Sequence, residues 1–272
     1  MSSDSPKVDL STFLAPSTPT RVNRFWFQHV ANDQNLLTLP DASVFKPWFS
    51  RDAIFDLECA TQFKPILEAV HQSWSQQKPQ TQAQVESQAN EILALVSPSS
   101  GLDWLGLVLL FDQLPRNCYR GTEAALVYTF FDPIARTIAS RALGLNIPSS
   151  SADIRYRLAL RFWFYLPLMH SEDLGHQELV LEKYWEHQED VRRFIDGTSV
   201  EGMSEQERGY HEILSSNREA VEGILAYNLK FQKEHHDLIA RFGRYPYRNQ
   251  VLGRTSTPEE EKFLREENIS FA

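Results

Sequence analysis

Apolar residues in most of the chain recur at the intervals of three, four and seven residues that a helix produces. The longest example follows Tyr210, and its apolar positions are Ile213, Leu214, Val221, Ile224, Leu225, Phe231, Leu238, Ile239 and Phe242. Runs rich in Val, Ile and Thr with the two-residue period of a strand are missing. The pattern therefore predicts an all-α fold without significant sheet, with roughly ten to twelve packed helices at about 15–20 residues per helix and loop.

Capping residues predict where several helices begin. Asp132 followed by Pro133 is typical of an N-cap with proline in the first turn. Two capping boxes, each with a hydroxyl residue and a glutamate three positions later, are predicted at Ser204 with Glu207 and at Thr257 with Glu260. Ser171 precedes two acidic residues that suit the positive end of a helix dipole, so it is the predicted cap of a long helix.

Proline, glycine and serine predict the helix ends. Pro115 should end the helix that contains the apolar run from Trp104 to Phe111, because proline disfavours helical backbone in the residue before it. Glycines that end helices are predicted at Gly144, Gly197 and Gly243. The pattern after Tyr210 is either one helix or two helices separated near Ser215–Ser216.

The first twenty residues differ in composition from the rest of the chain. Residues 1–20 are polar and rich in Ser and Pro, which predicts a disordered or loosely draped N-terminal arm. Residues 21–272 are then predicted to form a single all-α domain. The arm has no basic stretch followed by an apolar one, so no signal peptide is predicted.

Charge and cysteine content narrow the class of protein. The chain has 27 basic and 36 acidic residues, and its net charge of -9 disfavours non-specific binding to nucleic acid or to anionic membranes. The longest apolar run is far shorter than the roughly 20 residues that a membrane helix needs. The two cysteines, Cys59 and Cys118, are too far apart and too few for a disulfide framework, which predicts a reducing compartment and a cytoplasmic location.

Two titratable residues occupy positions where the helical pattern predicts apolar ones. Asp112 follows three apolar residues at helical intervals, so it should lie on the buried side of its helix. Because a buried carboxylate is costly unless it is paired, we expect an arginine or several donors beside it. His235 lies on the apolar stripe of the C-terminal helix, seven residues after Asn228. Both Asp112 and His235 are candidate catalytic groups, with a structural ion pair and a carbonyl-bonded core histidine as the alternatives.

Two polar segments concentrate arginine and amide side chains around a proline or glycine. These candidate ligand-binding residues are Gln113, Arg116, Asn117 and Arg120 in the first segment, and Arg244, Arg248 and Asn249 in the second. Between Lys230 and Arg254 there are six basic and two acidic residues, a local charge of +4 in an acidic chain. Arginine presents a planar fork that suits carboxylates and phosphates. The alternative is that these arginines pair with the acidic residues of the protein itself.

A third polar cluster follows Pro167. His170 and Glu172 are candidate catalytic groups there, and Glu172 and Asp173 each have a helical spacing to His176 that suits metal ligation. The ligand set is incomplete and two cysteines exclude a thiolate site, so we predict no metal and no cofactor. Motifs typical of phosphate-binding loops, serine hydrolases and zinc proteases are absent from the sequence.

Taken together, these motifs resemble the "domain of unknown function 924" family. The matching residues are Phe25-Trp26-Phe27, Asp112 to Asn117, Arg120-Gly121-Thr122, Leu166-Pro167-Leu168, His170 to Leu174, Gln177, His235, Arg241 to Arg244, Pro246, Arg248-Asn249, Leu252-Gly253-Arg254, Ser256-Thr257 and Phe263-Leu264. They cover nearly the whole chain after residue 20. The resemblance implies a superhelical array of helices similar to tetratricopeptide repeats, and it implies no particular reaction.

The chain departs from the family pattern at three places. Met169 stands where the family usually has Glu, and Tyr247 stands where it usually has His. The chain is also longer between Thr122 and Asp132 than the family usually is. The missing carboxylate and histidine weaken any metal or acid–base scheme that uses them.

Three functions fit these residues. The first is an enzyme or enzyme-like binder of a small polar, anionic or carbonyl-containing ligand, which would use metal-independent acid–base chemistry for group transfer, elimination or hydrolysis. The second is an interaction module that binds a peptide or protein in a helical groove, and the third is a structural ion-pair network. The first is favoured, because the charged residues lie at helix breaks and on apolar faces.

Overall fold

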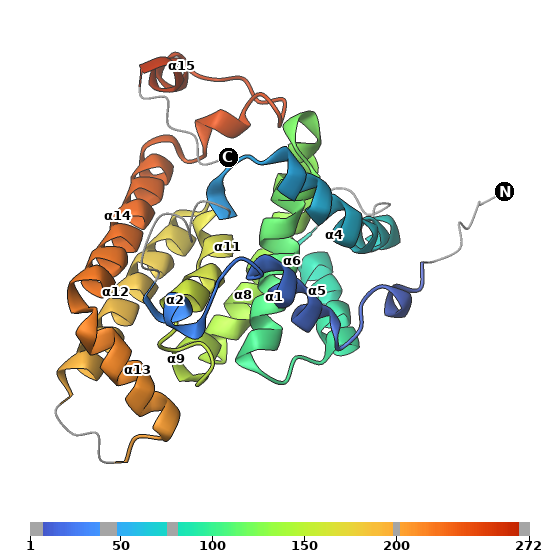
Figure 1. The fold of residues 1–272 in the computed structure, drawn as a ribbon. Helices are drawn as coiled ribbons and strands as arrows, with labels where there is room; N and C mark the ends of the chain where they lie inside the picture. The colour runs from blue at the N-terminus through green and yellow to red at the C-terminus, as the bar shows by residue number, and fades with distance from the viewer. Residues whose placement is uncertain (1–7, 39–47, 75–80, 198–201, 267–272) are drawn as a thin grey trace.

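The computed structural model of the protein confirms the all-α fold. It describes residues 8–38, 48–74, 81–197 and 202–266, and these form helices and connecting turns without a strand (Figure 1). None of the helices in these ranges is both long and apolar enough to cross a membrane.

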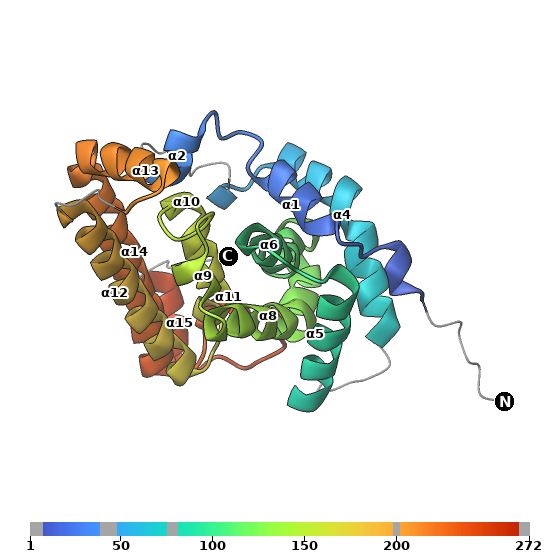
Figure 2. The same cartoon turned by 90° about the horizontal axis from the view of Figure 1, so that it is seen from below.

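Helix α6 (Gly101–Cys118) runs through the middle of the fold. It begins at a capping box, in which Ser100 Oγ accepts from Asp103 N and the Asp103 carboxylate accepts from Ser100 N. All residues from Trp104 to Pro115 are buried, as expected for a helix whose sequence is apolar on nearly every side. The helices that pack around it in Figure 2 are α1 (Thr18–Trp26), α4 (Ala53–Trp74) and α8 (Asp132–Gly144).

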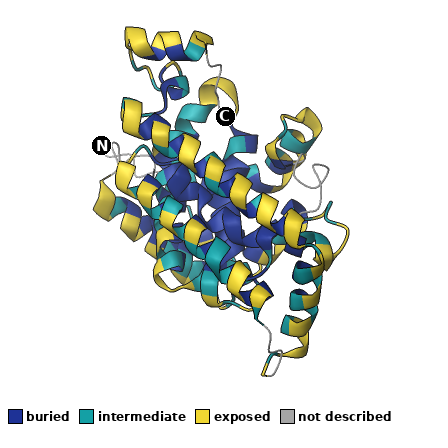
Figure 3. Ribbon diagram, turned by 90° about the vertical axis from the view of Figure 1, so that its left-hand side faces the viewer, coloured by how far each residue is buried: buried dark blue, intermediate teal, exposed yellow. Residues whose placement is uncertain are grey.

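Helices α12 (Leu174–Asp196) and α14 (Arg218–Phe242) form an outer pair. They lie side by side in both views, and α13 (Glu205–Ser216) precedes α14 (Figures 1 and 2). The pair is joined in its buried seam, where Gln232 Nε2 donates to Gln177 Oε1 at 2.8 Å. Figure 3 shows the buried residues gathered behind the outer helices, whose exposed residues face outward.

The remaining elements are mostly short. The other α-helices are α2 (Asp33–Thr38), α5 (Gln82–Val96), α7 (Ala124–Leu126), α9 (Ile147–Ser150), α10 (Leu158–Arg161), α11 (Leu166–Met169) and α15 (Pro258–Glu266). The 3-10 helices are η1 (Leu10–Thr12), η2 (Gly121–Glu123), η4 (Phe162–Phe164) and η5 (Pro246–Arg248). The element η3 (Val127–Phe131) is a π-helical turn. The described ranges contain more elements than the ten to twelve expected, because many are single turns.

Most of the predicted boundaries are confirmed. Helices end at or directly before the predicted glycines Gly144, Gly197 and Gly243. The predicted capping-box hydrogen bonds are present at Ser204 with Glu207 and at Thr257 with Glu260. The pattern after Tyr210 forms two helices, since α13 ends at Ser216 and α14 begins at Arg218.

The prediction that Pro115 ends its helix is wrong. Helix α6 continues to Cys118, and the backbone N–H of Tyr119 donates to the carbonyl of Pro115. Only three residues of α6 follow the proline, so the helix ends soon after the hydrogen bond that proline cannot donate. Arg116 and Asn117 therefore lie on the last helical turn, not in an irregular turn.

Two predicted caps have other roles. Asp173 caps α12 by accepting from His176 N, whereas Ser171 Oγ accepts from Asp173 N and contacts the ring of His176. The chain reaches Asp132 through the π-helical turn of residues 127–131, and no side-chain cap bond forms at the start of α8. The carboxylate of Asp132 is therefore available to another partner.

The N-terminal arm is more ordered than its composition predicts. Helix α1 already begins at Thr18, and Leu10 and Leu14 are buried in the main core. These apolar side chains anchor the segment before the predicted boundary at residue 20. Residues 1–7 lie outside the described ranges.

Candidate functional site

Asp112 is completely buried, and both of its carboxylate oxygens accept hydrogen bonds. Its Oδ1 accepts from His170 Nδ1 at 2.8 Å and from the Arg116 guanidinium at 3.3 Å. Its Oδ2 accepts from Gln113 Nε2 at 2.6 Å. The continuation of α6 past Pro115 places Arg116 one helical turn after Asp112, which makes this contact possible.

A second buried carboxylate shares Arg116. The same guanidinium nitrogen donates to Asp132 Oδ1 at 2.7 Å, and Arg248 lies 3.9 Å from Asp132 Oδ2. We call Asp112, Arg116, Asp132, His170 and Arg248 the central charge cluster. Within the described part of the chain, three buried atoms of this cluster have no hydrogen-bond partner: Arg116 Nε, Asp132 Oδ2 and Arg248 Nε.

Arg248 lies among aromatic rings. Its guanidinium is 4.4 Å from the ring centre of Tyr128, 4.6 Å from that of Tyr245 and 5.7 Å from that of Tyr247. Cation–π attraction of this kind is worth more when water is excluded, and Arg248 is only 4% exposed. Burial alone would lower the pKa of Arg248, but the tyrosines and Asp132 outweigh it and raise the pKa above its usual value.

His170 is held in one orientation and kept neutral. Burial, reinforced by the nearby Arg116, lowers the pKa of His170 below its usual value although Asp112 opposes this. A neutral imidazole that donates its Nδ1 proton to Asp112 carries a lone pair on Nε2. No partner for Nε2 lies among the described residues, and the side chain remains 13% exposed.

The pKa of Asp112 is lowered to about 2. Burial alone would raise it, but His170 and Arg116, together with the hydrogen bonds from His170 and Gln113, have the larger combined effect. Asp112 is therefore ionised at neutral pH, and it can orient the imidazole without taking its proton.

His235 lies on α14 and contacts a backbone carbonyl of that helix. Its Nδ1 is 2.9 Å from the carbonyl oxygen of Phe231, and its ring meets that of Tyr245 edge to face. The pKa of His235 is lowered to about 3, mainly by burial and in part by the nearby His170 and Arg248, against the effect of the carbonyl of Phe231. The imidazole is therefore neutral and supports Tyr245.

We expect the stability of the protein to fall below pH 6.5 because of His235. The folded pKa is about 3 and the unfolded one is near 6.5, so below pH 6.5 the unfolded chain takes up a proton that the folded chain does not. Between pH 7 and pH 5, wild type should lose about 1–2 kcal/mol more unfolding free energy than His235→Gln. Urea unfolding at both pH values measures this. His236→Gln, at the neighbouring position on the helix surface, should lose as much as wild type, and equal losses in all three proteins would contradict the assignment.

Glu172 anchors the C-terminal segment. Both of its oxygens accept from Arg254, at 3.0 and 2.7 Å, and Oε1 also accepts from Tyr245 N at 3.0 Å. Gln177 Nε2 contacts the hydroxyl of Tyr245, which donates to the carbonyl of Met169. These bonds fix Tyr245 beside Arg248, so Glu172 acts on the cluster through its neighbours.

The other predicted ligand-binding residues lie in two separate pairings. Arg120 binds both oxygens of Asp56 at 3.0 and 2.8 Å, and Asn117 donates to the same carboxylate at 2.8 Å. Arg244 binds both oxygens of Glu260 at 2.6 and 2.8 Å, and Asn249 contacts that carboxylate as well. Each set matches an arginine to an acidic residue of the protein. The structure thus brings Asp112, Gln113, Arg116, His170 and Arg248 together. The other four predicted residues, Asn117, Arg120, Arg244 and Asn249, lie in the two separate pairings.

Three residues at the site were not singled out from the sequence. The sequence pattern at Asp132 is that of a helix cap, and no motif distinguishes Tyr128 or Tyr245 from the other tyrosines of the chain. The extra length between Thr122 and Asp132 was the available signal for Tyr128. It coincides with the π-helical turn η3, and such turns frequently occur at functional sites.

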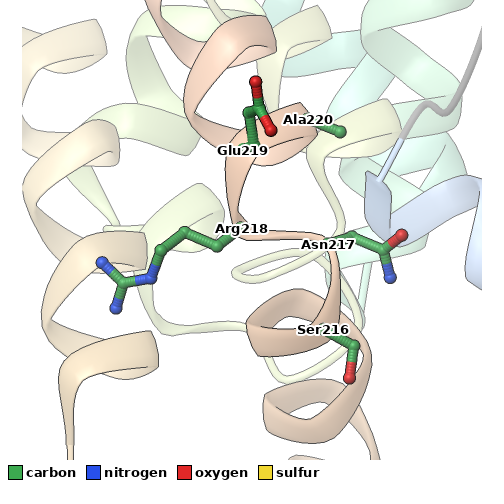
Figure 4. Close-up of a pocket in the computed structure, with 5 residues that line it drawn as sticks. All are labelled: Ser216, Asn217, Arg218, Glu219 and Ala220. Carbon is green, nitrogen blue, oxygen red and sulfur yellow. The ribbon is translucent and has the colours of Figure 1, made fainter.

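Two surface hollows lie away from the cluster. One of about 450 Å³ is lined by residues 216–220 at the junction of α13 and α14, where the side chains of Asn217, Arg218 and Glu219 point in different directions (Figure 4). The other, of about 470 Å³, lies between the start of α6 and α9. Over the described ranges, no three His, Cys, Asp or Glu side chains are grouped closely enough to hold a metal ion. Metal independence stays a prediction.

The fold and the cluster define an all-α protein with a buried centre of paired carboxylates, arginines and a histidine. The family described as bacterial proteins of unknown function (DUF924) matches residues 22–268, so the chain belongs to this family, as its motifs predict. The solved structure of a protein of unknown function, ATU0120 from Agrobacterium tumefaciens, is similar. It is 25% identical, the match covers 91% of this chain and 97% of that one, and the TM-score is 0.53. No curated protein matches the chain.

Proposed function

We propose that the central charge cluster is the acid–base site of an enzyme that acts on a small polar ligand without a metal, with His170 as the base. One observation carries the proposal: Asp112 holds the Nδ1 side of His170, and Nε2 has no partner among the described residues. A neutral imidazole oriented by a buried carboxylate is the arrangement that general-base catalysis uses.

The three buried atoms without partners support ligand binding. Buried polar atoms are nearly always hydrogen-bonded, and each one left alone costs about 1–3 kcal/mol. Arg116 Nε and Arg248 Nε are donors, and Asp132 Oδ2 is an acceptor, so a ligand with both donor and acceptor groups would satisfy them. The half-buried side chains of Tyr128 and Tyr247 lie beside Arg248, between its guanidinium and the protein surface.

The arginines of the cluster would contribute to this reaction by electrostatic stabilisation. Arg116 and Arg248 are fixed by folding, so they can stabilise negative charge that develops on a ligand oxygen without first reorganising. A peptide-binding module is less well supported, because its recognition groups would lie on exposed helix faces. The charges of Asp112, Asp132 and Arg248 are buried between α6, α8 and the C-terminal segment.

The test is a screen of small carboxylates, phosphates, amides and sugars, with consumption of each compound followed by NMR. We expect wild type to convert at least one compound and His170→Gln to convert it about 10²–10⁴-fold more slowly, because general-base catalysis contributes about that much. His236→Gln, the same change on the surface of α14, should keep the wild-type rate. Equal conversion by His170→Gln would contradict the base role, and so would the absence of any conversion by wild type.

A further inference from the structure

The end of the chain has a small apolar core of its own. The buried residues of this core, which is separate from the main one, are Leu238, Ile239, Tyr245 and Phe263. Two hydrogen bonds from Arg244 to Glu260 join the start of the segment to α15. We call residues 244–266 the C-terminal unit, and Figure 1 shows α15 beyond the end of α14. The unit therefore holds together through its own contacts and those with the end of α14.

Polar contacts tie the C-terminal unit to the start of α12 and the residues before it. Arg254 donates to both oxygens of Glu172, and both side chains remain partly exposed. The hydroxyl of Tyr245 donates to the carbonyl of Met169 and contacts Gln177 Nε2. Water can replace hydrogen bonds of this kind, so breaking them costs far less than their strength in isolation.

A glycine at the start of the unit can serve as a hinge. Gly243 directly follows α14 and has a φ of +67°, a left-handed conformation that costs glycine little. Glycine also reaches the widest range of other backbone angles, so a rotation here redirects the unit without straining α14. Leu238 and Ile239 lie close to this point in the chain and would move little against the unit, whereas Arg248 and Arg254 would swing further.

The unit supplies one side of the central charge cluster. Asp112 and Asp132 belong to α6 and α8, whereas Arg248 belongs to the unit. These three residues are only 0%, 2% and 4% exposed. Because Asp132 Oδ2 and Arg248 Nε are both buried, a ligand that bonds to the two atoms reaches them only when the residues part.

We propose that the C-terminal unit is a lid, which opens about Gly243 to admit the ligand and closes to return Arg248 to Asp132. This inference rests on the proposed function, since it describes how the acid–base site is reached. Closure would surround the ligand with the arginines and exclude water, as lids do in many enzymes.

The first test measures opening without a ligand. Tyr245 N donates to Glu172 Oε1 across the boundary of the unit, so hydrogen exchange of this amide, followed by NMR, reports each opening. Arg254→Gln removes the ion pair and leaves this bond, and it should raise the exchange rate about tenfold, because a hydrogen bond to a charged group contributes at least about that factor. Arg265→Gln, which breaks an exposed pair with Glu261 on the same unit, should exchange as wild type does.

The amides of α6 serve as the internal reference. They should exchange at the wild-type rate in Arg254→Gln, because only the C-terminal unit opens. An equal rise at α6 would mean that the whole protein opens, and unchanged exchange of the Tyr245 amide would mean that the pair does not hold the unit closed. Either result would refute the lid.

The second test ties the lid shut. In Glu172→Cys with Arg254→Cys, a short bis-maleimide can join the two positions, whose side chains meet in the closed state, while Cys59 and Cys118 are buried. Linked protein should lose conversion of the compound found by the screen, whereas Arg254→Cys treated with the same reagent should keep it. Equal conversion before and after linkage would refute the gating role. If wild type converts nothing, the proposed function fails, and amide exchange still decides whether the unit opens.

Discussion

Replacing Asp132 by alanine should lower the unfolding free energy by about 3–5 kcal/mol, the usual cost of removing one partner of a buried ion pair. Arg116 loses its shortest contact with a carboxylate, at 2.7 Å, and Arg248 loses the carboxylate that lies 3.9 Å away. Arg248 then stays buried among tyrosine rings without a counter-charge within salt-bridge distance in the described part of the chain. Urea unfolding at pH 7 measures the difference.

Two controls show whether this loss comes from the buried charges. Asp237→Ala removes an exposed carboxylate that pairs with Lys233 at 2.9 Å, and it should cost less than about 1 kcal/mol. In Asp132→Ala with Arg248→Met, both buried charges are gone, so much of the loss should be recovered. A loss below about 1 kcal/mol for Asp132→Ala alone would mean that the cluster does not depend on this carboxylate.

Replacing Asp112 by asparagine should slow conversion of the ligand by about 10²–10⁴-fold, the range of general acid–base contributions. The amide keeps the shape of the side chain, but it does not hold the Nδ1–H form of His170 as an ionised carboxylate does. The rate is measured on the compound that the screen identifies. If Asp112→Asn converted the compound at the wild-type rate, Asp112 would have no role in the mechanism.

The fold should tolerate this change better than the sequence suggests. From the sequence alone, loss of Asp112 is expected to leave a buried arginine without a partner. In the structure Arg116 also binds Asp132 at 2.7 Å, so its charge stays compensated. We therefore expect Asp112→Asn to destabilise the protein less than Asp132→Ala does.

The sequence predicts the secondary structure well because the signals are local. Apolar residues at helical intervals, capping boxes and terminal glycines each act within a few residues, and the structure confirms most of them. Pro115 shows the limit of such signals. The proline removes one hydrogen bond near the end of α6, and the helix continues three residues further among packed neighbours.

The site was only partly predictable, because pairing depends on contacts between distant residues. The place of Asp112 on an apolar face indicated a buried carboxylate with an arginine, and Arg116 lies beside it. The sequence could not distinguish Arg248, which reaches the cluster, from Arg244, which pairs with Glu260. The place of Asp132 in the cluster could not be recognised from the sequence, because aspartate before proline is so often a helix cap. The superhelical arrangement that the family resemblance implies, and the cytoplasmic location, stay predictions.

The protonation state of His170 tests the central claim most directly. Long-range ¹H–¹⁵N NMR of the imidazole, assigned with His170→Gln, reports the charge and the tautomer at each pH. The account predicts a neutral ring at pH 7 with its proton on Nδ1 and its lone pair on Nε2, because burial and Arg116 lower the pKa below its usual value. An imidazolium at pH 7 would contradict it, since Asp112 and His170 would then form a structural ion pair without a free base.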